Sequence, residues 1–321
     1  MPSSSFVVAS AATIAVGMGM ALQGVANGEL AGVLGSVVFA STFSFASGLV
    51  VLVVVTAASQ RGRAGLSRAV RLVRTGEFPW WMTLGGLAGA AVIVAQSLTV
   101  PVLGVAVFTM AYVAGQLTGA LAIDGTSLPP GGRAPLTAWR VVGTAIVLAG
   151  VSISAAGVLA QGVPVWAPIP PFLAGLGTVF QQAFNGRLRA ASGSARAATL
   201  TNFLVGSIFL VALSVVLLAA GSRASGVPQL PGEAWILLGG TLGVLFIGTT
   251  TVTVAHLGVL LLSLMTLVGS LTGSLVIDLT FGSAEADVDA ATFWSIGVVV
   301  AGVAVTNIPR RRGGFTSSGA T

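Results

Sequence analysis

Apolar segments of about 20 residues, separated by short polar or proline- and glycine-containing breaks, run through nearly the whole chain. Because the hydrocarbon core of a bilayer is about 30 Å thick, a helix needs about 20 apolar residues to cross it. Only 7% of the 321 residues are charged, whereas a soluble domain has roughly 25%. The sequence therefore predicts an integral membrane protein. The predicted helices cover residues 6–26, 32–57, 80–99, 101–123, 139–160, 168–186, 197–220, 235–255, 257–277 and 292–308.

These segments indicate helices and not the strands of a membrane barrel. Barrel strands would alternate apolar and polar residues over segments of roughly ten residues. The runs from Val50 to Val55 and from Leu210 to Leu218 are apolar without alternation. In lipid, only helices or closed barrels satisfy their backbone hydrogen bonds. The expected fold class is therefore an all-α membrane protein.

The basic residues predict the orientation of the helices. All 14 are arginines, and with a cytoplasmic N-terminus 13 of them fall on the cytoplasmic side, with Arg223 as the external exception. This distribution follows the positive-inside rule. We therefore predict ten transmembrane helices with both termini cytoplasmic. The cytoplasmic arginines are Arg61, Arg63, Arg68, Arg71, Arg74, Arg133, Arg140, Arg187, Arg189, Arg196, Arg310, Arg311 and Arg312.

The second half of the chain repeats the first half. The segment QGVANGEL at 23–30 matches QQAFNGRL at 181–188, and GQLTG at 115–119 matches GSLTG at 269–273. Matches that keep their order along the chain indicate a duplication. The further matched pairs are Ser44-Phe45 with Asn202-Phe203, Gly48 with Gly206, Trp81 with Trp235, Gly85-Gly86 with Gly239-Gly240, Gly89 with Gly243, Leu103-Gly104 with Leu257-Gly258, and Ile123-Asp124 with Ile277-Asp278.

Each copy holds five predicted helices, and this odd number means that the second copy enters the membrane from the opposite side. We therefore predict two inverted five-helix repeats, at 6–160 and 172–308, joined by an external linker at 161–171. Residues 309–321 are predicted to be a disordered cytoplasmic tail. Inverted repeats place a solute site near the bilayer midplane and produce alternating access. The pattern predicts a secondary transporter.

The repeated motifs also carry a family resemblance. The motif Q-G-x-x-N-G-x-L, the Trp-x-x-x-Gly-Gly motif that begins at Trp81, and G-Q-L-T-G followed by Ile123-Asp124 resemble the drug/metabolite transporter superfamily. Within it the chain is similar to the inner-membrane exporter (YdcZ-like) family in a fused two-copy form. The resemblance implies a central cavity lined by the first, third and fourth helices of each copy. Arg187 in place of Glu29, and Ser270 in place of Gln116, imply that this cavity is chemically asymmetric.

Uncharged amides within the predicted helices are the candidate substrate-binding residues. An amide without a hydrogen bond in lipid costs several kcal/mol, so these side chains must face protein or water. The alternatives are hydrogen bonds between helices and, for Asn27 and Asn185, a cap at the C-terminal end of a helix. The candidates are Gln23, Asn27, Gln96, Gln116, Gln181, Asn185 and Asn202, and Gln182 is a further buried amide.

Four ionisable residues are candidates for gating or coupling. Asp124 and Asp278 end matched helices, although a solvated carboxylate beside a loop is the favoured interpretation of this position. His256, the only histidine, lies at a predicted turn, where an interfacial location is the simpler interpretation. Glu29 adjoins a repeated motif near the expected cavity. Ionisable residues in membrane segments are functional candidates by default, but none of the four proves proton coupling.

The composition excludes several other functions. Without cysteine there is no thiol chemistry, and without lysine no nucleotide-binding P-loop. No catalytic motif or metal-ligand group is present, so we expect no enzyme activity and no cofactor. The basic charge indicates membrane topology and no nucleic acid. We expect a multi-pass protein of the bacterial cytoplasmic membrane, with the lipid bilayer and a small-molecule substrate as partners. A homodimer, and a non-transporting scaffold function, remain alternatives.

Three further patterns have structural interpretations. The segment from Arg61 to Arg74 is expected to be a simple cytoplasmic loop, with an amphipathic helix on anionic lipid as the alternative. The glycines of the Gly115-x-x-x-Gly119 type indicate close helix packing, with hinge motion as a secondary role. The six tryptophans near helix ends are typical of interfacial anchors.

Overall fold

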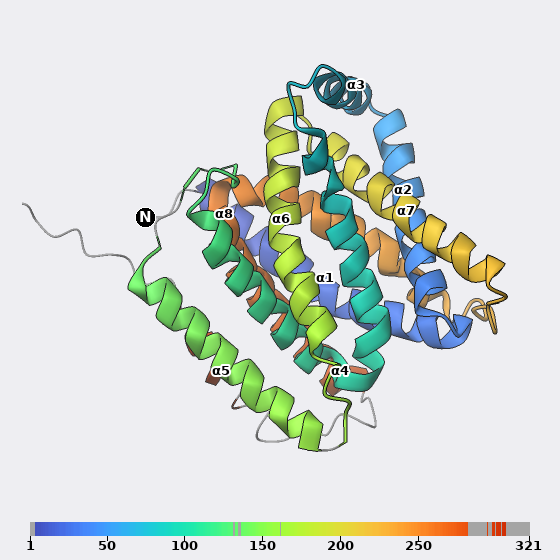
Figure 1. Cartoon of the computed structure of the whole chain (residues 1–321), viewed down its shortest axis with the longest axis vertical. Helices are drawn as coiled ribbons and strands as arrows, with labels where there is room; N and C mark the ends of the chain where they lie inside the picture. The colour runs from blue at the N-terminus through green and yellow to red at the C-terminus, as the bar shows by residue number, and fades with distance from the viewer. Residues whose placement is uncertain are drawn as a thin grey trace, which may run out of the picture.

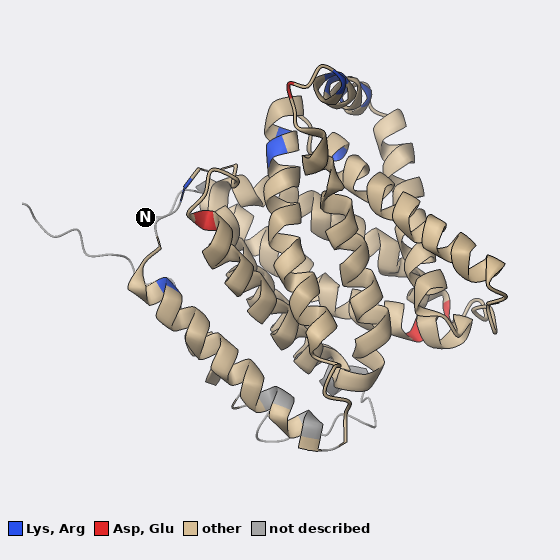
Figure 2. Cartoon of the chain, in the orientation of Figure 1, with Lys and Arg blue, Asp and Glu red and all other residues tan. Residues whose placement is uncertain are grey.

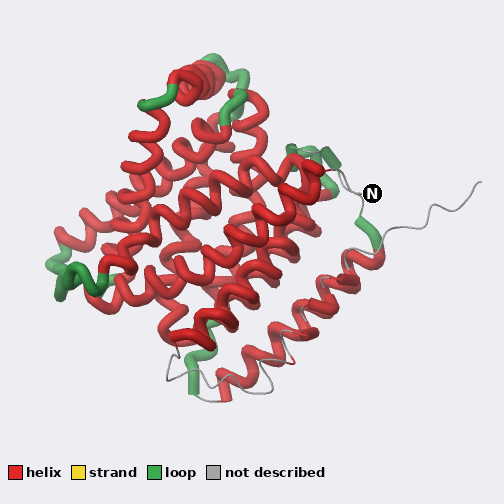
Figure 3. Tube along the Cα trace, turned by 180° about the vertical axis from the view of Figure 1, so that it is seen from behind, coloured by secondary structure: helices red, strands yellow, loops and turns green. Residues whose placement is uncertain are grey.

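The computed structural model describes residues 4–281 apart from 131, 134, 135 and 161, and then 294, 297, 298, 300–302, 304 and 305. These described residues form helices and no strand, as Figure 3 shows from behind. The elements are α1 Ser4–Leu34, α2 Val37–Ala57, α3 Gln60–Arg74, η1 Trp80–Leu84, α4 Gly85–Asp124, α5 Ala138–Ala160, α6 Ile169–Ser192, α7 Ala195–Ala219, η2 Ala234–Leu238 and α8 Gly239–Phe281. Most of the predicted tenth helix, 292–308, and all of the predicted tail lie outside the described residues.

Six helices of the described part are long and apolar enough to cross a membrane. They are Ser5–Leu34, Val37–Ala57, Trp80–Val105, Val107–Asp124, Ala195–Ala219 and Ala234–Val259, and shorter apolar helices occur at Ala138–Ile153 and Leu261–Ile277. Large apolar side chains also face outward, for example Val54 and Val216, which are 61% and 62% exposed. Such exposure fits lipid, which is as apolar as these side chains.

Serine caps begin three of the helices. The side chains of Ser36, Ser59 and Ser194 accept hydrogen bonds from the backbone N–H three residues later, at 3.2–3.3 Å. Such a cap pairs an N–H group that the first helical turn would otherwise leave without a partner. Each cap fixes the residue at which its helix begins, so that α2, α3 and α7 start directly after the capping serine.

Two glycines break the longest helical elements. Gly104 in α4 has φ 74° and ψ 166°, and Gly258 in α8 has φ 71° and ψ 168°. This left-handed backbone conformation suits glycine because it has no Cβ. The predicted spans 80–99 and 101–123 therefore join at Gly104, and 235–255 and 257–277 join at Gly258. The breaks lie a few residues later than predicted.

The helices pack in a reciprocal arrangement between the two segments of the duplication. α1 packs most extensively against α8, and α4 packs most extensively against α6, while α2 crosses α7. Figure 1 shows these helices as one bundle, with α5 along its outer edge. Glycines allow the closest crossings: a Cβ added at Gly17 would lie 2.6 Å from the Thr266 carbonyl oxygen. At the matched Gly175, a Cβ would overlap the Tyr112 carbonyl oxygen.

The segment after α2 is a helix, so its prediction as a simple loop is wrong. α3 buries its small residues Gly62, Gly65 and Ala69 and exposes its arginines. A Cβ on Gly65 would overlap Ser194, so close packing at the start of α7 depends on the glycine. Figure 2 shows the charged residues mainly near the ends of the helices, with α3 prominent among the basic segments.

Two predicted caps are also wrong. α1 continues to Leu34 and α6 continues to Ser192, so Asn27 and Asn185 lie inside these helices and not at their C-terminal ends. Gly193 ends α6 in the left-handed conformation. Both asparagine side chains are therefore available for contacts between helices.

Candidate functional site

One cluster of amides joins α1 to α4 and α8. The Asn27 Nδ2 group donates to Gln96 Oε1 at 2.9 Å, and the Gln23 Nε2 group donates to the Gly239 carbonyl oxygen at 3.0 Å. All three amide side chains are buried, with at most 3% exposed. The bonds between helices predicted as one interpretation of these amides are therefore present.

A second cluster occupies the matched position on α6 and α7. The Asn202 Oδ1 atom accepts from Gln181 Nε2 at 3.0 Å and from Asn185 Nδ2 at 3.1 Å. Glycines of the other copy leave room for both clusters: a Cβ at Gly89 would lie 2.5 Å from Gln181 Nε2, and one at Gly239 would overlap Asn27 Oδ1. Each cluster therefore packs against a glycine in the third predicted span of the other copy.

A narrow cavity of about 20 Å³ lies between the clusters. This volume is sufficient for roughly one water molecule. Its wall contains several repeat-matched pairs, and the two phenylalanine rings of one pair lie 4.9 Å apart between centroids. The lining residues are Met20, Gln23, Ser44, Phe45, Gly89, Val92, Ile93, Tyr112, Gln181, Phe203, Gly240, Gly243, Phe246 and Ile247.

Gln116 lies next to the cavity and not in its wall. The Gln116 Nε2 group donates to the Tyr112 hydroxyl at 3.1 Å, and this hydroxyl donates to Thr178 Oγ1 at 3.0 Å. Both hydrogen-bonding functions of the Tyr112 hydroxyl are therefore used within the protein. Gln116 fixes the ring that lines the cavity.

Several buried polar atoms around the cavity have no hydrogen-bond partner among the described residues. They are Asn27 Oδ1, Ser44 Oγ, Gln96 Nε2, Gln116 Oε1, Asn202 Nδ2 and both amide atoms of Gln182. Leaving one such atom buried and unpaired costs about 1–3 kcal/mol. The region is thus more polar than its own hydrogen bonds require, which is typical of a site that receives water or a polar solute.

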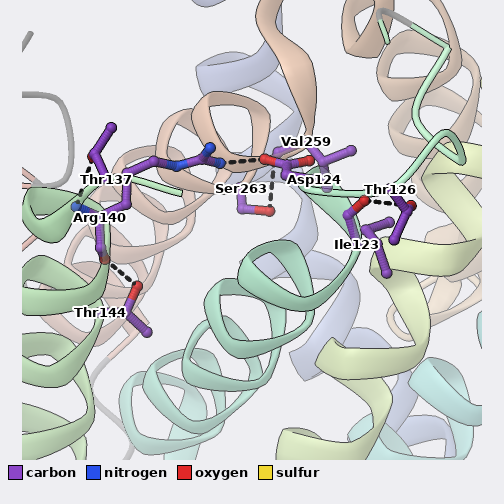
Figure 4. A network of polar contacts seen from close by, with 8 residues as sticks. All are labelled: Ile123, Asp124, Thr126, Thr137, Arg140, Thr144, Val259 and Ser263. Atoms are coloured by element: carbon purple, nitrogen blue, oxygen red, sulfur yellow. Dashed lines mark hydrogen bonds and ion pairs between the residues drawn. The ribbon is translucent and has the colours of Figure 1, made fainter. Parts of the chain in front are cut away.

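Asp124 forms a buried ion pair. It ends α4 with 2% exposure, and the Arg140 Nη2 group of α5, which is 8% exposed, donates to Asp124 Oδ2. Figure 4 shows the pair beside Val259 and Ser263, which follow the break at Gly258. The interpretation of Asp124 as a solvated carboxylate is therefore wrong, because the arginine holds it inside the protein.

A family model described as "Putative inner membrane exporter, YdcZ" matches two segments, residues 8–153 and 167–305, which together cover most of the chain. The chain belongs to this family. The resemblance based on the repeated motifs is therefore confirmed, and the two matched segments agree with a two-copy form of the exporter. No curated protein matches the chain.

Family membership and the apolar helices together establish a multi-pass inner membrane protein with a transport role. A transporter family also argues against an enzyme. Among the described residues, no group of three or more His, Cys, Asp or Glu side chains could hold a metal ion.

Glu29 and His256 lie apart from the cavity. Glu29 is exposed on α1, and His256 is exposed on α8 two residues before Gly258. The His256 Nδ1 atom lies 3.3 Å from the Val252 carbonyl oxygen of its own helix. The Asp278 side chain lies outside the described residues. Neither Glu29 nor His256 belongs to the described cavity wall.

The aromatic lining was not among the predicted site residues. Phe45, Phe203, Tyr112 and Phe246 line the cavity although none was a candidate. The match of Ser44-Phe45 with Asn202-Phe203 served only as evidence for the duplication. A repeat-matched aromatic residue beside a matched polar residue was the available signal, since a pseudo-symmetric site is built from such pairs.

Proposed function

We propose that this exporter is a secondary transporter that moves small metabolites or amphiphilic compounds by alternating access between two inverted five-helix repeats. The observation that carries the proposal is the cavity whose wall takes matched residues from both copies. Gln23 with Gln181, Phe45 with Phe203 and Gly89 with Gly243 each meet there. A site composed of equivalent halves can exchange their roles.

The packing supports this mechanism. The α1 with α8 and α4 with α6 crossings are equivalent by the duplication, and the kinks at Gly104 and Gly258 have nearly equal backbone angles. If the two copies exchange their packing arrangements, the protein reaches a second conformation built from equivalent contacts. The two conformations then have similar free energies. In the conformation described here, contact between Phe45 and Phe203 leaves the cavity nearly filled.

The absence of native cysteine allows a direct test. Ser44→Cys and Gln181→Cys place one thiol in the cavity wall from each copy, and a membrane-impermeant maleimide is added to one side of proteoliposomes. A maleimide is too large for a cavity of about 20 Å³, so labelling measures opening. We expect each thiol to react from either side, with the two rates changing in opposite directions when Gly104→Ala or Gly258→Ala biases the conformation.

Matched controls separate this result from general reactivity. Thr75→Cys lies in an exposed connection and should react from one side only, whereas Val54→Cys faces outward from α2 and should stay unreactive in lipid. If both cavity thiols are as unreactive as the thiol at position 54 from both sides, the scaffold function replaces the transporter.

A further inference from the structure

The cavity wall contains aromatic rings and uncharged polar groups. The rings come from Phe45, Tyr112, Phe203 and Phe246, and the polar groups come from the Gln23, Gln181 and Ser44 side chains. None of the described residues in this wall is an Asp, Glu, Arg or His. The wall therefore offers a charged solute no side chain of opposite charge.

Charge is costly in such a place. A charged group that leaves water requires a partner of opposite charge, and the effective penalty without one is several kcal/mol per ion. The buried ion pair does not help, because Asp124 is already engaged with Arg140 and both lie outside the wall. An uncharged solute avoids this penalty.

The paired rings favour a flat solute. Phe45 and Phe203 lie 4.9 Å apart between centroids with an angle of 32° between their planes. Carbon atoms in contact are about 3.5–4.0 Å apart, so a planar molecule enters between the rings when they separate by roughly one ring thickness. Each ring is backed by a glycine of the other copy, since a Cβ at Gly206 would overlap Phe45 and one at Gly48 would overlap Phe203.

The polar groups favour a solute with a hydrogen-bonding edge. Gln23 and Gln181 each use one N–H in a bond of 3.0 Å within the protein, and an amide has a second N–H and a carbonyl oxygen. The Ser44 hydroxyl is buried and has no partner among the described residues. A polar edge that reaches these groups would supply the missing hydrogen bond.

We propose that the cavity binds an uncharged planar solute with a polar edge, such as an aromatic amide or a small heterocycle, between Phe45 and Phe203. The proposal rests on the proposed transport function and narrows its substrate class. A chemically similar cation or anion is rejected because the wall offers it no counter-charge.

Three probes of nearly equal size and shape test the charge preference: benzamide, benzamidine and benzoate, which are neutral, cationic and anionic at pH 7. The full chain in neutral detergent is titrated with each, and both the thermal midpoint and the heat of binding are measured. A ligand that binds the native state raises the midpoint by mass action. We expect saturable binding of benzamide and at least about tenfold weaker binding of both ions.

Two variants locate the binding. Phe203→Leu removes one ring of the pair and should abolish the midpoint shift with benzamide, measured against the variant's own midpoint without ligand. Phe209→Leu, the same change on an outward-facing residue of α7 that is 47% exposed, should retain the full shift. Retention of the full shift in Phe203→Leu would place the binding outside the cavity and overturn the proposal.

The probe results also have clear opposing outcomes. Tighter binding of either ion, equal binding of all three probes, or no binding of benzamide up to its solubility limit would overturn the proposed solute class. Labelling of Ser44→Cys and Gln181→Cys uses no ligand, so it reports separately on transport. If both cavity thiols are labelled from either side but an ion binds more tightly than benzamide, this inference is rejected and the proposed function stands.

Discussion

Replacing Gly17 with alanine tests whether the close crossing of α1 and α8 holds the bundle together. A Cβ at Gly17 would lie 2.6 Å from the Thr266 carbonyl oxygen and 3.1 Å from the Gly269 Cα atom. Both are backbone atoms, so the helices must separate, and overpacking of this kind costs about 1–3 kcal/mol. The substitution also gains about 1 kcal/mol of helix propensity, which obscures the effect in a single variant.

Gly19→Ala removes this ambiguity. It lies two residues further along the same helix, and its Cβ would make an ordinary contact of 3.7 Å with Leu242. Both variants gain the same propensity, so the difference between them isolates the crossing. At about 2–4 °C per kcal/mol, a cost of about 1–3 kcal/mol should place the midpoint of Gly17→Ala in detergent roughly 2–12 °C below that of Gly19→Ala. Equal midpoints would refute the importance of the crossing.

Three other perturbations have defined outcomes. Asp124→Asn should cost about 3–5 kcal/mol of stability because Arg140 remains buried without its counter-charge. The double variant Asp124→Leu with Arg140→Met should recover most of the lost thermal midpoint. A double variant no more stable than Asp124→Asn would contradict this. Gly258→Ala should lose about 1–3 kcal/mol because a φ of 71° with a ψ of 168° is a backbone region essentially confined to glycine, and Gly258→Asn should lose as much because asparagine tolerates only the αL region with ψ near about +47°; unchanged midpoints in both variants would argue against backbone strain. Replacing the exposed Arg71 and Arg74 of α3 with glutamine should lower the stability that the protein gains in phosphatidylglycerol vesicles relative to phosphatidylcholine vesicles. The expected loss is about 1 kcal/mol per arginine. An unchanged gain would show that α3 does not contact anionic lipid.

The helical segments were predictable because apolar length alone specifies a membrane helix. Their exact ends were not, because α1 and α6 continue beyond the apolar stretch and bury Asn27 and Asn185 against other helices. α3 was also missed as a helix. Its exposed arginines resemble a loop in composition, while the glycines that pack it against α7 have no hydropathy signal.

The candidate site was predictable in its polar part only. Gln23 and Gln181 were selected because amides are rare and costly in lipid, and both line the cavity. Phe45 and Phe203 are ordinary in an apolar helix, so only their positions in space distinguish them. The pairing of Asp124 with Arg140 depends on how α5 lies against the end of α4, which local sequence does not specify.

The reciprocal packing has a consequence for the order in which the protein is made. α4 completes its main interface only when α6 has been synthesised, and α1, which is synthesised well before α8, meets its main partner only when α8 is inserted. The glycine-lined face of α1 therefore remains in contact with lipid during synthesis of most of the chain. A ribosome that stops after α7 leaves a fragment in which α1 lacks its main partner and Gln23 lacks the Gly239 carbonyl oxygen to which it donates, a defect that membrane quality control can recognise.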